Sequence, residues 1–301
     1  MSSVVFRPLV DGEESLFDSL PDLLPLRQIS YAEGLAGGGF HPSRTWVALR
    51  EGRVVARAAW VLPPGAVGGP WLERFDVIDS PQVGAGLLAA AHEALGGPRP
   101  YYAALPAGWH TSPSVVSAVA PALAAAESAG LVPTGERLRL RWVPGAGADR
   151  PAAAGPAVRP AAGPHEIDTL VGRVVSPDVL TGSETARAVA GLDLATDPRP
   201  WLTGEATAWH VAHDGGEPLG LLGTAGQACW PMLGYLGALP GPRTQEVRSA
   251  LVDAALRVLV ADGAEEVVAD ADADRSDVLA DLGRADFRPI RARLTFEPGN
   301  A

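Results

Sequence analysis

One order of predicted elements occurs twice in the 301 residues, once in each half of the chain. Each half has a strand–turn–strand hairpin, a further strand, an amphipathic helix, a buried strand, a second helix and a closing strand. The repeated parts are the hairpins at Thr45–Leu62 and Ala208–Gly223, the next strands at Trp71–Val77 and Met232–Leu239, the first helices at Val83–Leu95 and Gln245–Asp262, and the closing strands at Arg137–Trp142 and Arg291–Phe296. A unit repeated at roughly half the chain length indicates a duplicated domain, because the repeats of a solenoid are much shorter.

The boundary between the halves is the segment Val143–Pro164. It is rich in Ala, Pro and Gly and has neither a helical nor an alternating apolar period. Near its end, Ala157–Pro160 (AVRP) resembles Val5–Pro8 (VFRP), and both are typical of a first strand. We therefore expect an N-terminal domain over residues 1–143, a linker over residues 144–164 and a C-terminal domain over residues 165–301.

Composition and charge argue against several classes of function. The net charge of −11 disfavours nucleic-acid binding, which needs a basic face. Cys229 is the only cysteine, so the chain has neither an internal disulfide nor a cysteine zinc site, and no metal-ligand spacing occurs. The sequence shows no signal-peptide pattern and no apolar run of membrane-spanning length. We expect a cytoplasmic protein that binds neither nucleic acid nor membrane and holds no metal.

Three segments of the second half match the pattern of a known family. They are Leu233–Pro240, which precedes the long helix, then Gly263–Val267 and Gly283–Phe287. In these segments the chain resembles the GNAT superfamily of N-acyltransferases, and more narrowly its two-domain members from actinobacteria. The resemblance implies two tandem GNAT folds of the α/β (α+β) class, each a mixed, mostly antiparallel sheet flanked by helices. It also implies that splayed central strands accept the pantetheine arm of an acyl donor along their backbone groups.

In this family the central strand runs into an R-G-x-G-x-G loop, whose amides and helix N-terminus hold the pyrophosphate of acyl-CoA. The matching residues Arg243–Arg248 keep the arginine and lose all three glycines. Glu246 places a carboxylate where phosphate oxygens would lie, and Arg248 is placed to compensate its charge. Gly84 and Gly86 of the first half either belong to a second donor loop or permit close helix packing. The resemblance assigns donor binding to Gly237, Ala238, Leu239, Arg243, Thr244, Gln245, Glu246, Val247, Arg248, Gly84 and Gly86.

The reaction that the resemblance implies is direct attack of an amine on a thioester, which needs a base, an oxyanion donor and an acid for the sulfur. Tyr235 on the central strand is the candidate acid or acceptor-orienting group, and a packed core tyrosine is the alternative. His210 is the candidate base, with a structural histidine as the alternative. Glu205 is a second candidate base or an acceptor anchor, unless it is a surface glutamate. The tyrosine that the family places on its last helix is absent from residues 276–285.

The sequence therefore predicts an N-acyltransferase that moves an acetyl or other short acyl group from acetyl-CoA or another acyl-CoA to a small-molecule amine. Two alternatives stay open. The first takes the acyl group from the phosphopantetheine of an acyl carrier protein in a specialised-metabolite pathway, where the lost glycines would matter less. The second is a catalytically silent GNAT fold that binds a ligand or a partner.

Overall fold

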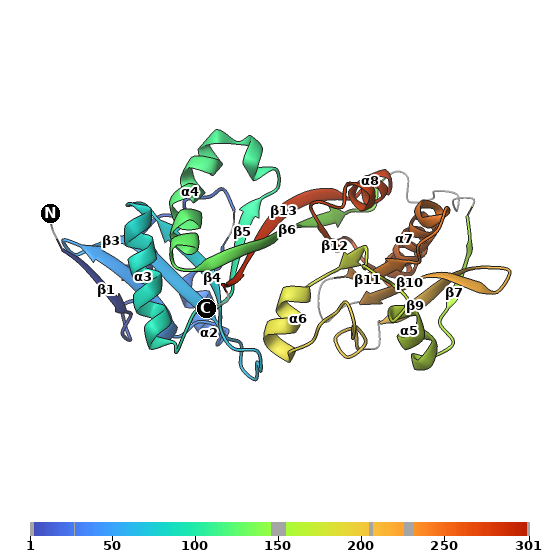
Figure 1. The fold of residues 1–301 in the computed structure, drawn as a ribbon, viewed down its shortest axis with the longest axis horizontal. Helices are drawn as coiled ribbons and strands as arrows, with labels where there is room; N and C mark the ends of the chain where they lie inside the picture. The colour runs from blue at the N-terminus through green and yellow to red at the C-terminus, as the bar shows by residue number, and fades with distance from the viewer. Residues whose placement is uncertain (1–2, 27, 146–154, 205–206, 226–230, 300–301) are drawn as a thin grey trace. The chain divides into compact units, whose positions relative to one another are not determined.

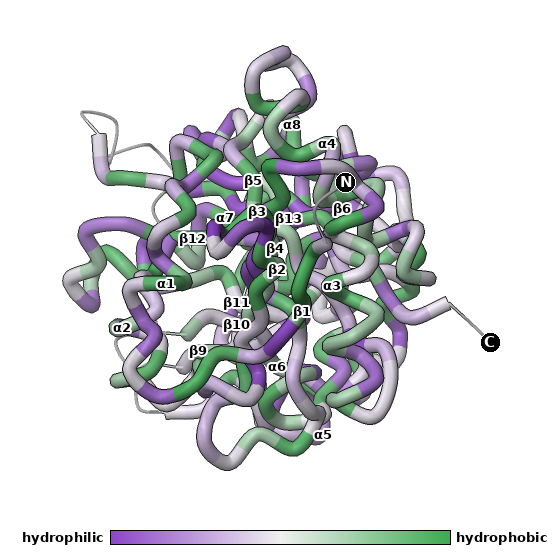
Figure 2. Tube along the Cα trace, turned by 90° about the vertical axis from the view of Figure 1, so that its left-hand side faces the viewer, coloured by the Kyte–Doolittle hydropathy of each residue, from purple (hydrophilic) through white to green (hydrophobic). Residues whose placement is uncertain are grey.

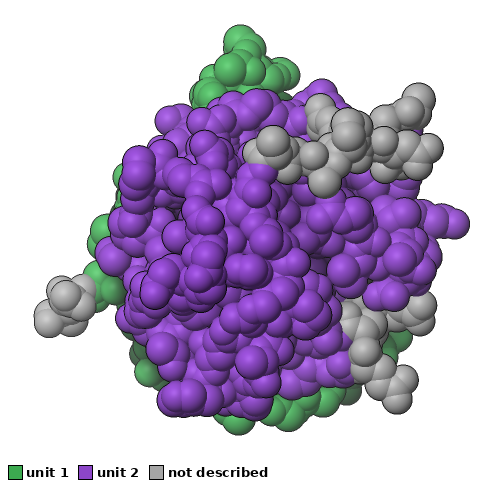
Figure 3. All heavy atoms as spheres, turned by 90° about the vertical axis from the view of Figure 1, so that its right-hand side faces the viewer, with its two compact units in different colours: residues 1–136, 291–301 green, residues 137–290 purple. Residues whose placement is uncertain are grey.

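The structure is a computed structural model, and it describes residues 3–26, 28–145, 155–204, 207–225 and 231–299. The chain divides into two compact units (Figure 1). The first unit contains residues 1–136 and 291–301, and the second contains residues 137–290, coloured green and purple in Figure 3. No helix among the described residues is long and apolar enough to cross a membrane.

The first unit is a mixed sheet in which β1, β2, β3 and β4 are antiparallel neighbours and β5 runs parallel to β4. Its elements in chain order are β1 (Val4–Pro8), α1 (Glu14–Asp18), α2 (Tyr31–Ala36), β2 (Thr45–Arg50), β3 (Arg53–Val61), β4 (Trp71–Val77), α3 (Pro81–Ala94), β5 (Tyr101–Pro106), α4 (Pro113–Ser128) and the first part of β6 (Leu131–Trp142). Short 3-10 turns at Pro42–Arg44 and Trp109–Thr111 precede β2 and α4.

The second unit repeats this arrangement, with β7, β9, β10 and β11 antiparallel and β12 parallel to β11. Its elements are β7 (Ala157–Pro160), α5 (Pro164–Val171), β8 (Val179–Leu180), α6 (Ser183–Ala190), β9 (Ala208–Asp214), β10 (Glu217–Ala225), β11 (Met232–Ala238), α7 (Thr244–Ala261), β12 (Val267–Asp272), α8 (Ser276–Arg284) and the start of β13 (Arg288–Pro298). In both units a β-bulge interrupts the pairing of the hairpin's second strand with the next strand, after Ala59 and after Gly223.

Alternate residues of the strands point to opposite faces of each sheet, and each face has an apolar core. Hydrophobic residues recur along the strands and helices (green in Figure 2). In the first unit Trp46 packs with residues of α3 and α4, whereas its neighbour Val47 packs with Phe17 of α1. In the second unit Leu222 packs with residues of α7, and Leu221 packs with residues of α5. The predicted fold class, a mostly antiparallel sheet with helices on both sides in each half, is confirmed.

A second repeated feature is an arginine–glutamate pair beside the first strand of each unit. Arg7 of β1 donates two hydrogen bonds to Glu13, at 2.6 and 2.8 Å. Arg159 of β7 donates two to Glu166, at 2.9 and 2.5 Å. In each unit the carboxylate also accepts a backbone N–H of the loop that it closes, from Val10 or from Ala162. The similarity of the sequences around Arg7 and Arg159 therefore corresponds to the same local structure.

The closing strands differ from the arrangement expected from the sequence, which kept each of them in its own half. Residues Arg137–Trp142 of β6 pair with β12 in the second unit. Residues Arg291–Phe296 of β13 pair with β5 in the first unit, where Phe296 stacks on Tyr101 at 5.5 Å between ring centroids. Each unit thus completes its sheet with a strand from the other half, because either strand can satisfy the open edge of β5 or β12.

Candidate functional site

The candidate site of the second unit lies where β11 and β12 separate. These parallel strands pair at Met232 and Val268, and beyond that point the short strand β8 takes the place of β12 beside β11. We call this region the β11/β12 splay. Asp178, Val179 and Thr181 are each less than 5% exposed there. A segment from the connection between α5 and α6 is therefore built into the sheet.

Thr181 holds this segment to both separated strands. Its N–H donates to the Gly234 carbonyl at 3.0 Å, and its hydroxyl donates to the Leu233 carbonyl. The same hydroxyl oxygen accepts the N–H of Asp270 of β12 at 3.0 Å. One threonine therefore satisfies backbone groups that the separation of β11 and β12 would leave unpaired.

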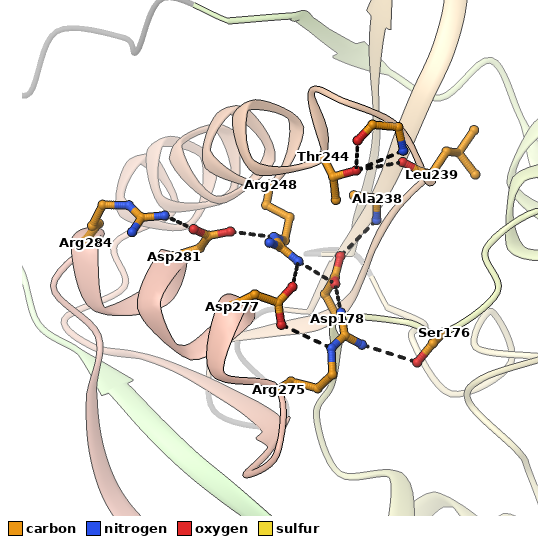
Figure 4. Close-up of polar contacts among 11 residues, drawn as sticks. Ser176, Asp178, Ala238, Leu239, Thr244, Arg248, Arg275, Asp277, Asp281 and Arg284 are labelled. Carbon is orange, nitrogen blue, oxygen red and sulfur yellow. Dashed lines mark hydrogen bonds and ion pairs between the residues drawn. The ribbon is translucent and has the colours of Figure 1, made fainter.

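Asp178 occupies the other end of the segment (Figure 4). Its N–H donates to the Leu236 carbonyl at 2.7 Å, and its carboxylate accepts the Ala238 N–H at 3.0 Å. The carboxylate also accepts from Arg248 of α7 at 3.1 Å and from Arg275 at 2.7 Å. An anionic group of the protein thus lies where the end of β11, the first turns of α7 and the start of α8 meet.

Arg248 is the centre of a charge cluster that is buried at Arg248, Asp178 and Asp281 and reaches solvent at its other members. Its guanidinium, 6% exposed, also donates to Asp277 at 2.7 Å and to Asp281 at 2.5 Å, and Asp281 accepts from Arg284 (Figure 4). Three guanidinium groups, from Arg248, Arg275 and Arg284, therefore face three carboxylates. Burial, the largest single influence, would raise the pKa of Asp277, but the hydrogen bonds from Arg248, the Val278 N–H and Arg275, together with the charge of Arg248, outweigh it and hold this pKa at about 2. The cluster is electrically balanced, which buried charges require.

The residues predicted to form the donor loop lie next to this cluster but are engaged differently. Arg243 pairs with Asp214 at 2.5 Å and with Glu246 at 2.8 Å, so Arg243 compensates Glu246, and the expectation that Arg248 would do so is wrong. The side chain of Thr244 accepts the Gly241 N–H and lies 3.3 Å from the Leu239 carbonyl (Figure 4).

The remaining predicted donor-loop residues are placed by packing and by the strand ladder. Val247 is buried, whereas Gln245 and Glu246 lie in the first turn of α7 with more exposed side chains. Gly237 packs so tightly that an added Cβ would approach Val174 to 2.8 Å. Leu239 donates its N–H to the Leu219 carbonyl at 2.8 Å, so this amide is already satisfied.

The two glycines of the first unit lie inside α3 and pack against neighbouring elements. A Cβ added to Gly84 would approach Ala125 of α4 to 2.7 Å, and one added to Gly86 would approach the Phe6 ring to 2.7 Å. These distances favour the interpretation in which the glycines permit close helix packing.

The predicted catalytic residues are not brought together. Tyr235 is fully buried beside Trp209 on the face that carries α5, and burial raises the pKa of its phenol. His210 lies next to Trp209 on β9 and so points to the opposite face, and burial lowers its pKa. No hydrogen-bond partner for the Tyr235 hydroxyl is present in the described part of the chain. Glu205 and Cys229 lie outside the described residues.

A cavity of about 280 Å³ adjoins the end of the β11/β12 splay where the two strands are still paired. Met232 and Val268 line it, and these two residues belong to the same apolar core as Tyr235. Its other lining residues are Arg139, Thr181, Gly182, Thr185 and Trp201. The bidentate pair of Arg139 with Asp270, at 2.8 Å for both bonds, neutralises the charge beside the cavity. The cavity therefore suits a ligand with an apolar body.

The corresponding region of the first unit lacks an inserted strand. There β4 and β5 pair at Leu72 and Tyr101, and no described strand lies between them beyond that point. Leu23 and Leu24 line a cavity of about 30 Å³ together with residues of β4, β5 and α4, which is room for about one water molecule. The α1–α2 connection therefore lies against the β4/β5 splay with the side chains of Leu23 and Leu24 rather than with its backbone.

Sequence reasoning missed Asp178 and Thr181, and it missed the acidic pair on α8. The run Pro177–Thr181 has no motif, and its partners lie between 52 and 97 positions away along the chain. In the described residues no group of three or more His, Cys, Asp or Glu side chains is placed to hold a metal ion.

Comparison with known proteins depends on structure rather than sequence. No protein-family model matches the chain, and no curated protein gives a significant match. A GCN5-related N-acetyltransferase from Sphaerobacter thermophilus superposes with a TM-score of 0.57 and 16% identity, over 99% of this chain and 97% of that one. A tandem GNAT protein from the clavulanic acid biosynthesis pathway, without AcCoA, gives a TM-score of 0.50 and 18% identity, over 99% of this chain and all of that one. The protein has a tandem GNAT fold.

A conserved protein of unknown function from Staphylococcus epidermidis is also similar, with a TM-score of 0.51 and 9% identity over 81% of this chain and 91% of that one. At these identities the likeness establishes the fold, so activity has to be argued from the site. In this tandem GNAT fold the two splayed strand pairs are equivalent, and the segment Asp178–Thr181 distinguishes the second from the first.

Proposed function

We propose that this tandem GNAT protein is an acyltransferase that moves an acetyl or other short acyl group from a pantetheine thioester to a small-molecule amine. The observation that carries the proposal is the edge of β11 in its splay. At every second residue, the carbonyls of Gly234 and Leu236 accept backbone N–H groups of an extended segment, and the N–H of Ala238 donates to the carboxylate of Asp178. A pantetheine arm is also an extended chain with amide groups, so the same edge suits it.

The proposed reaction forms a C–N bond from the amine to the thioester carbonyl carbon and breaks the C–S bond. The amine loses a proton, and the departing thiolate gains one. Of the sequence candidates, Tyr235 is favoured as the proton donor, because it lies on the same face as the 280 Å³ cavity and its raised pKa keeps the phenol protonated. His210 lies on the opposite face of the sheet from Tyr235 and the cavity, so it is not placed to take the amine proton there, and a water molecule is the proposed acceptor of that proton.

The 280 Å³ cavity is the proposed acceptor pocket. Its apolar lining with one neutralised arginine favours an amine with an apolar or aromatic body over a polyanionic one. Trp201 contributes a large aromatic surface to the lining, which can also stack on a protonated amine.

The test of this function is product formation. The protein is incubated with acetyl-CoA or with acetyl-pantetheine and a panel of apolar amines, and both the acylated amine and the free thiol are quantified by mass spectrometry. The expected result is one free thiol per acylated amine, with Trp201→Ala raising KM for the amine and Trp109→Ala, in the first unit, leaving it unchanged. Absence of product with both donors would contradict the proposal.

A carrier protein is a second candidate donor, and the state of Arg243 favours it. Two carboxylates already engage this guanidinium, so the loop is poorly suited to attract the pyrophosphate of a free nucleotide. A pantetheine arm on a carrier protein brings no such group to the loop. If the carrier is the donor, acetyl-phosphopantetheine, which keeps the phosphate of the carrier-bound arm, should react with a kcat/KM at least equal to that of acetyl-CoA.

A further inference from the structure

The segment Asp178–Thr181 binds to the edge of β11 in the way that an extended ligand would. It lies in extended conformation along β11, antiparallel to it, with Leu180 opposite Tyr235 and Val179 opposite Leu236. Its hydrogen bonds engage the carbonyls of Gly234 and Leu236, the groups proposed to receive a donor arm. Strand addition of this kind is a common way for a sheet edge to bind an extended chain.

The segment also resembles a donor arm in carrying a negative charge at its end. The Asp178 carboxylate accepts the Ala238 N–H and bonds from Arg248 and Arg275, so backbone and cationic groups converge on one anion. A pantetheine arm likewise continues into a phosphate, both in CoA and on a carrier protein. The segment therefore supplies an extended backbone and a terminal anion in the same order as a donor.

We propose that residues Asp178–Thr181 act as an internal substitute for the donor arm and compete with it, so that the second unit accepts a donor only when this segment leaves the β11/β12 splay. This inference rests on the proposed function for the identity of the displaced ligand. It makes the α5–α6 connection an autoinhibitory element, and it predicts that weakening the segment strengthens donor binding.

Two variants weaken the segment at different points. Thr181→Val keeps the shape of the side chain and removes the hydroxyl bonds to Leu233 and Asp270. Asp178→Asn keeps the size and removes the carboxylate that Arg275 and Arg248 bind. The matched controls are Thr224→Val, a buried threonine of β10, and Asp22→Asn, which removes an arginine-bound carboxylate from the first unit.

The experiment titrates full-length wild type and the four variants with acetyl-CoA and with acetyl-pantetheine. Each segment variant should lower the Kd for both donors by about tenfold, because it raises the population of the open splay, and the controls should leave the Kd within about twofold of wild type. In wild type at saturating donor, hydrogen exchange of the Asp178 and Thr181 amides should become faster, since both lose their carbonyl acceptors. Melting curves identify a variant that fails to fold, and the other variant then decides.

Several outcomes would overturn the inference. Donor binding that leaves exchange of residues 178–181 unchanged or slower would show that the segment is a fixed wall. Folded variants with no gain in affinity, or a gain for acetyl-CoA without one for acetyl-pantetheine, would equally contradict an arm substitute. Displacement of the segment without acyl transfer to any amine would sink the proposed function alone, whereas transfer with the segment unmoved would sink only the inference.

Discussion

The two units differ in how they cover the point where their parallel strand pair separates. In both, a parallel strand pair separates after a single paired position, and the connection between the first two helices lies against the separated strands. In the first unit Leu23 and Leu24 of that connection cover the splay with apolar side chains, and Asp22 anchors it to Arg57 and Arg74. In the second unit the backbone of the connection enters the sheet, and Asp178 anchors it.

The two units have the same strand order, but different groups satisfy the backbone N–H and C=O groups where the parallel strands separate. Arg57 is 1% exposed and donates to the carbonyls of Phe17 and Leu20, at 2.9 and 2.6 Å, so side chains bind the connection in the first unit. In the second unit the connection binds through its own amides. Only the second arrangement resembles the hydrogen bonding of an extended amide ligand, which is why the two splays differ in their expected affinity for one.

The largest predicted effect comes from the exchanged closing strands. A chain that ends at Ile290 loses the part of β13 that pairs with β5 in the first unit. Loss of the buried Phe296 ring alone costs about 3–5 kcal/mol, and the β5 edge loses its hydrogen bonds as well. We expect the N-terminal unit to unfold although the deletion is at the other end of the chain.

Hydrogen exchange tests this prediction, because the amides of β5 should lose protection while those of β10 retain it. A chain that ends at Gly299 is the control. Loss of protection confined to the second unit would contradict the swapped arrangement of the closing strands and would indicate that each closing strand pairs within its own half.

The second prediction compares the two buried arginines. Arg248→Met leaves three carboxylates without their central partner, and Arg57→Met leaves Asp76 and Asp22 short of a partner. Removing one side of a buried ion pair costs about 3–5 kcal/mol, so each variant should destabilise its own unit by that amount in urea unfolding. Arg57→Met also loses two hydrogen bonds to backbone carbonyls, so it should lower the free energy of unfolding at least as much as Arg248→Met does. A smaller loss in Arg57→Met would contradict this prediction.

The fold of each unit is more predictable from the sequence than the pairing of the closing strands or the residues of the site. The repeated order of elements and the AVRP and VFRP segments specify the duplicated fold, because local patterns determine strands and helices. The exchange of closing strands was not predictable, since Arg137–Trp142 and Arg291–Phe296 are equally suited to either sheet edge. The site is less predictable still: the family resemblance assigns Arg248 to the donor loop, but its carboxylate partners lie between 29 and 70 positions away and carry no motif.

The third prediction concerns acid sensitivity. Burial, with a smaller contribution from Arg99, lowers the pKa of His92 to about 4, and its side chain packs on Trp60 in the first unit. Because the folded pKa lies below the unfolded one, the unfolded state takes up the proton first, so the stability that depends on neutral His92 is fully present only above about pH 6.5. That contribution, about 3 kcal/mol at most, disappears as pH falls from about 6.5 through 4.

The measurement is urea unfolding of the first unit between pH 7 and pH 4. His92→Gln should flatten the pH dependence, and His165→Gln, an exposed histidine of the second unit, should not. An unchanged slope in His92→Gln would assign the acid sensitivity to other groups.

The smallest predicted effect concerns the arginine–glutamate pair that occurs beside the first strand of both units, so it compares the two units at an equivalent position. Glu13→Gln and Glu166→Gln each remove a bidentate partner of a solvent-accessible arginine, and solvent screening keeps the contribution of such pairs to stability small. The hydrogen bonds from Arg159 and from the Ala162 N–H hold the pKa of Glu166 at about 2, below its ordinary value, so the stabilisation is present above about pH 4.5 and is lost as pH falls toward 2. The pKa of Glu13 is lowered for the same reasons, with Arg7 and the Val10 N–H as partners. Double-mutant cycles of Arg7 with Glu13 and of Arg159 with Glu166 should therefore give equal coupling energies. Coupling in one unit and none in the other would mean that the copies differ energetically even where their structures agree.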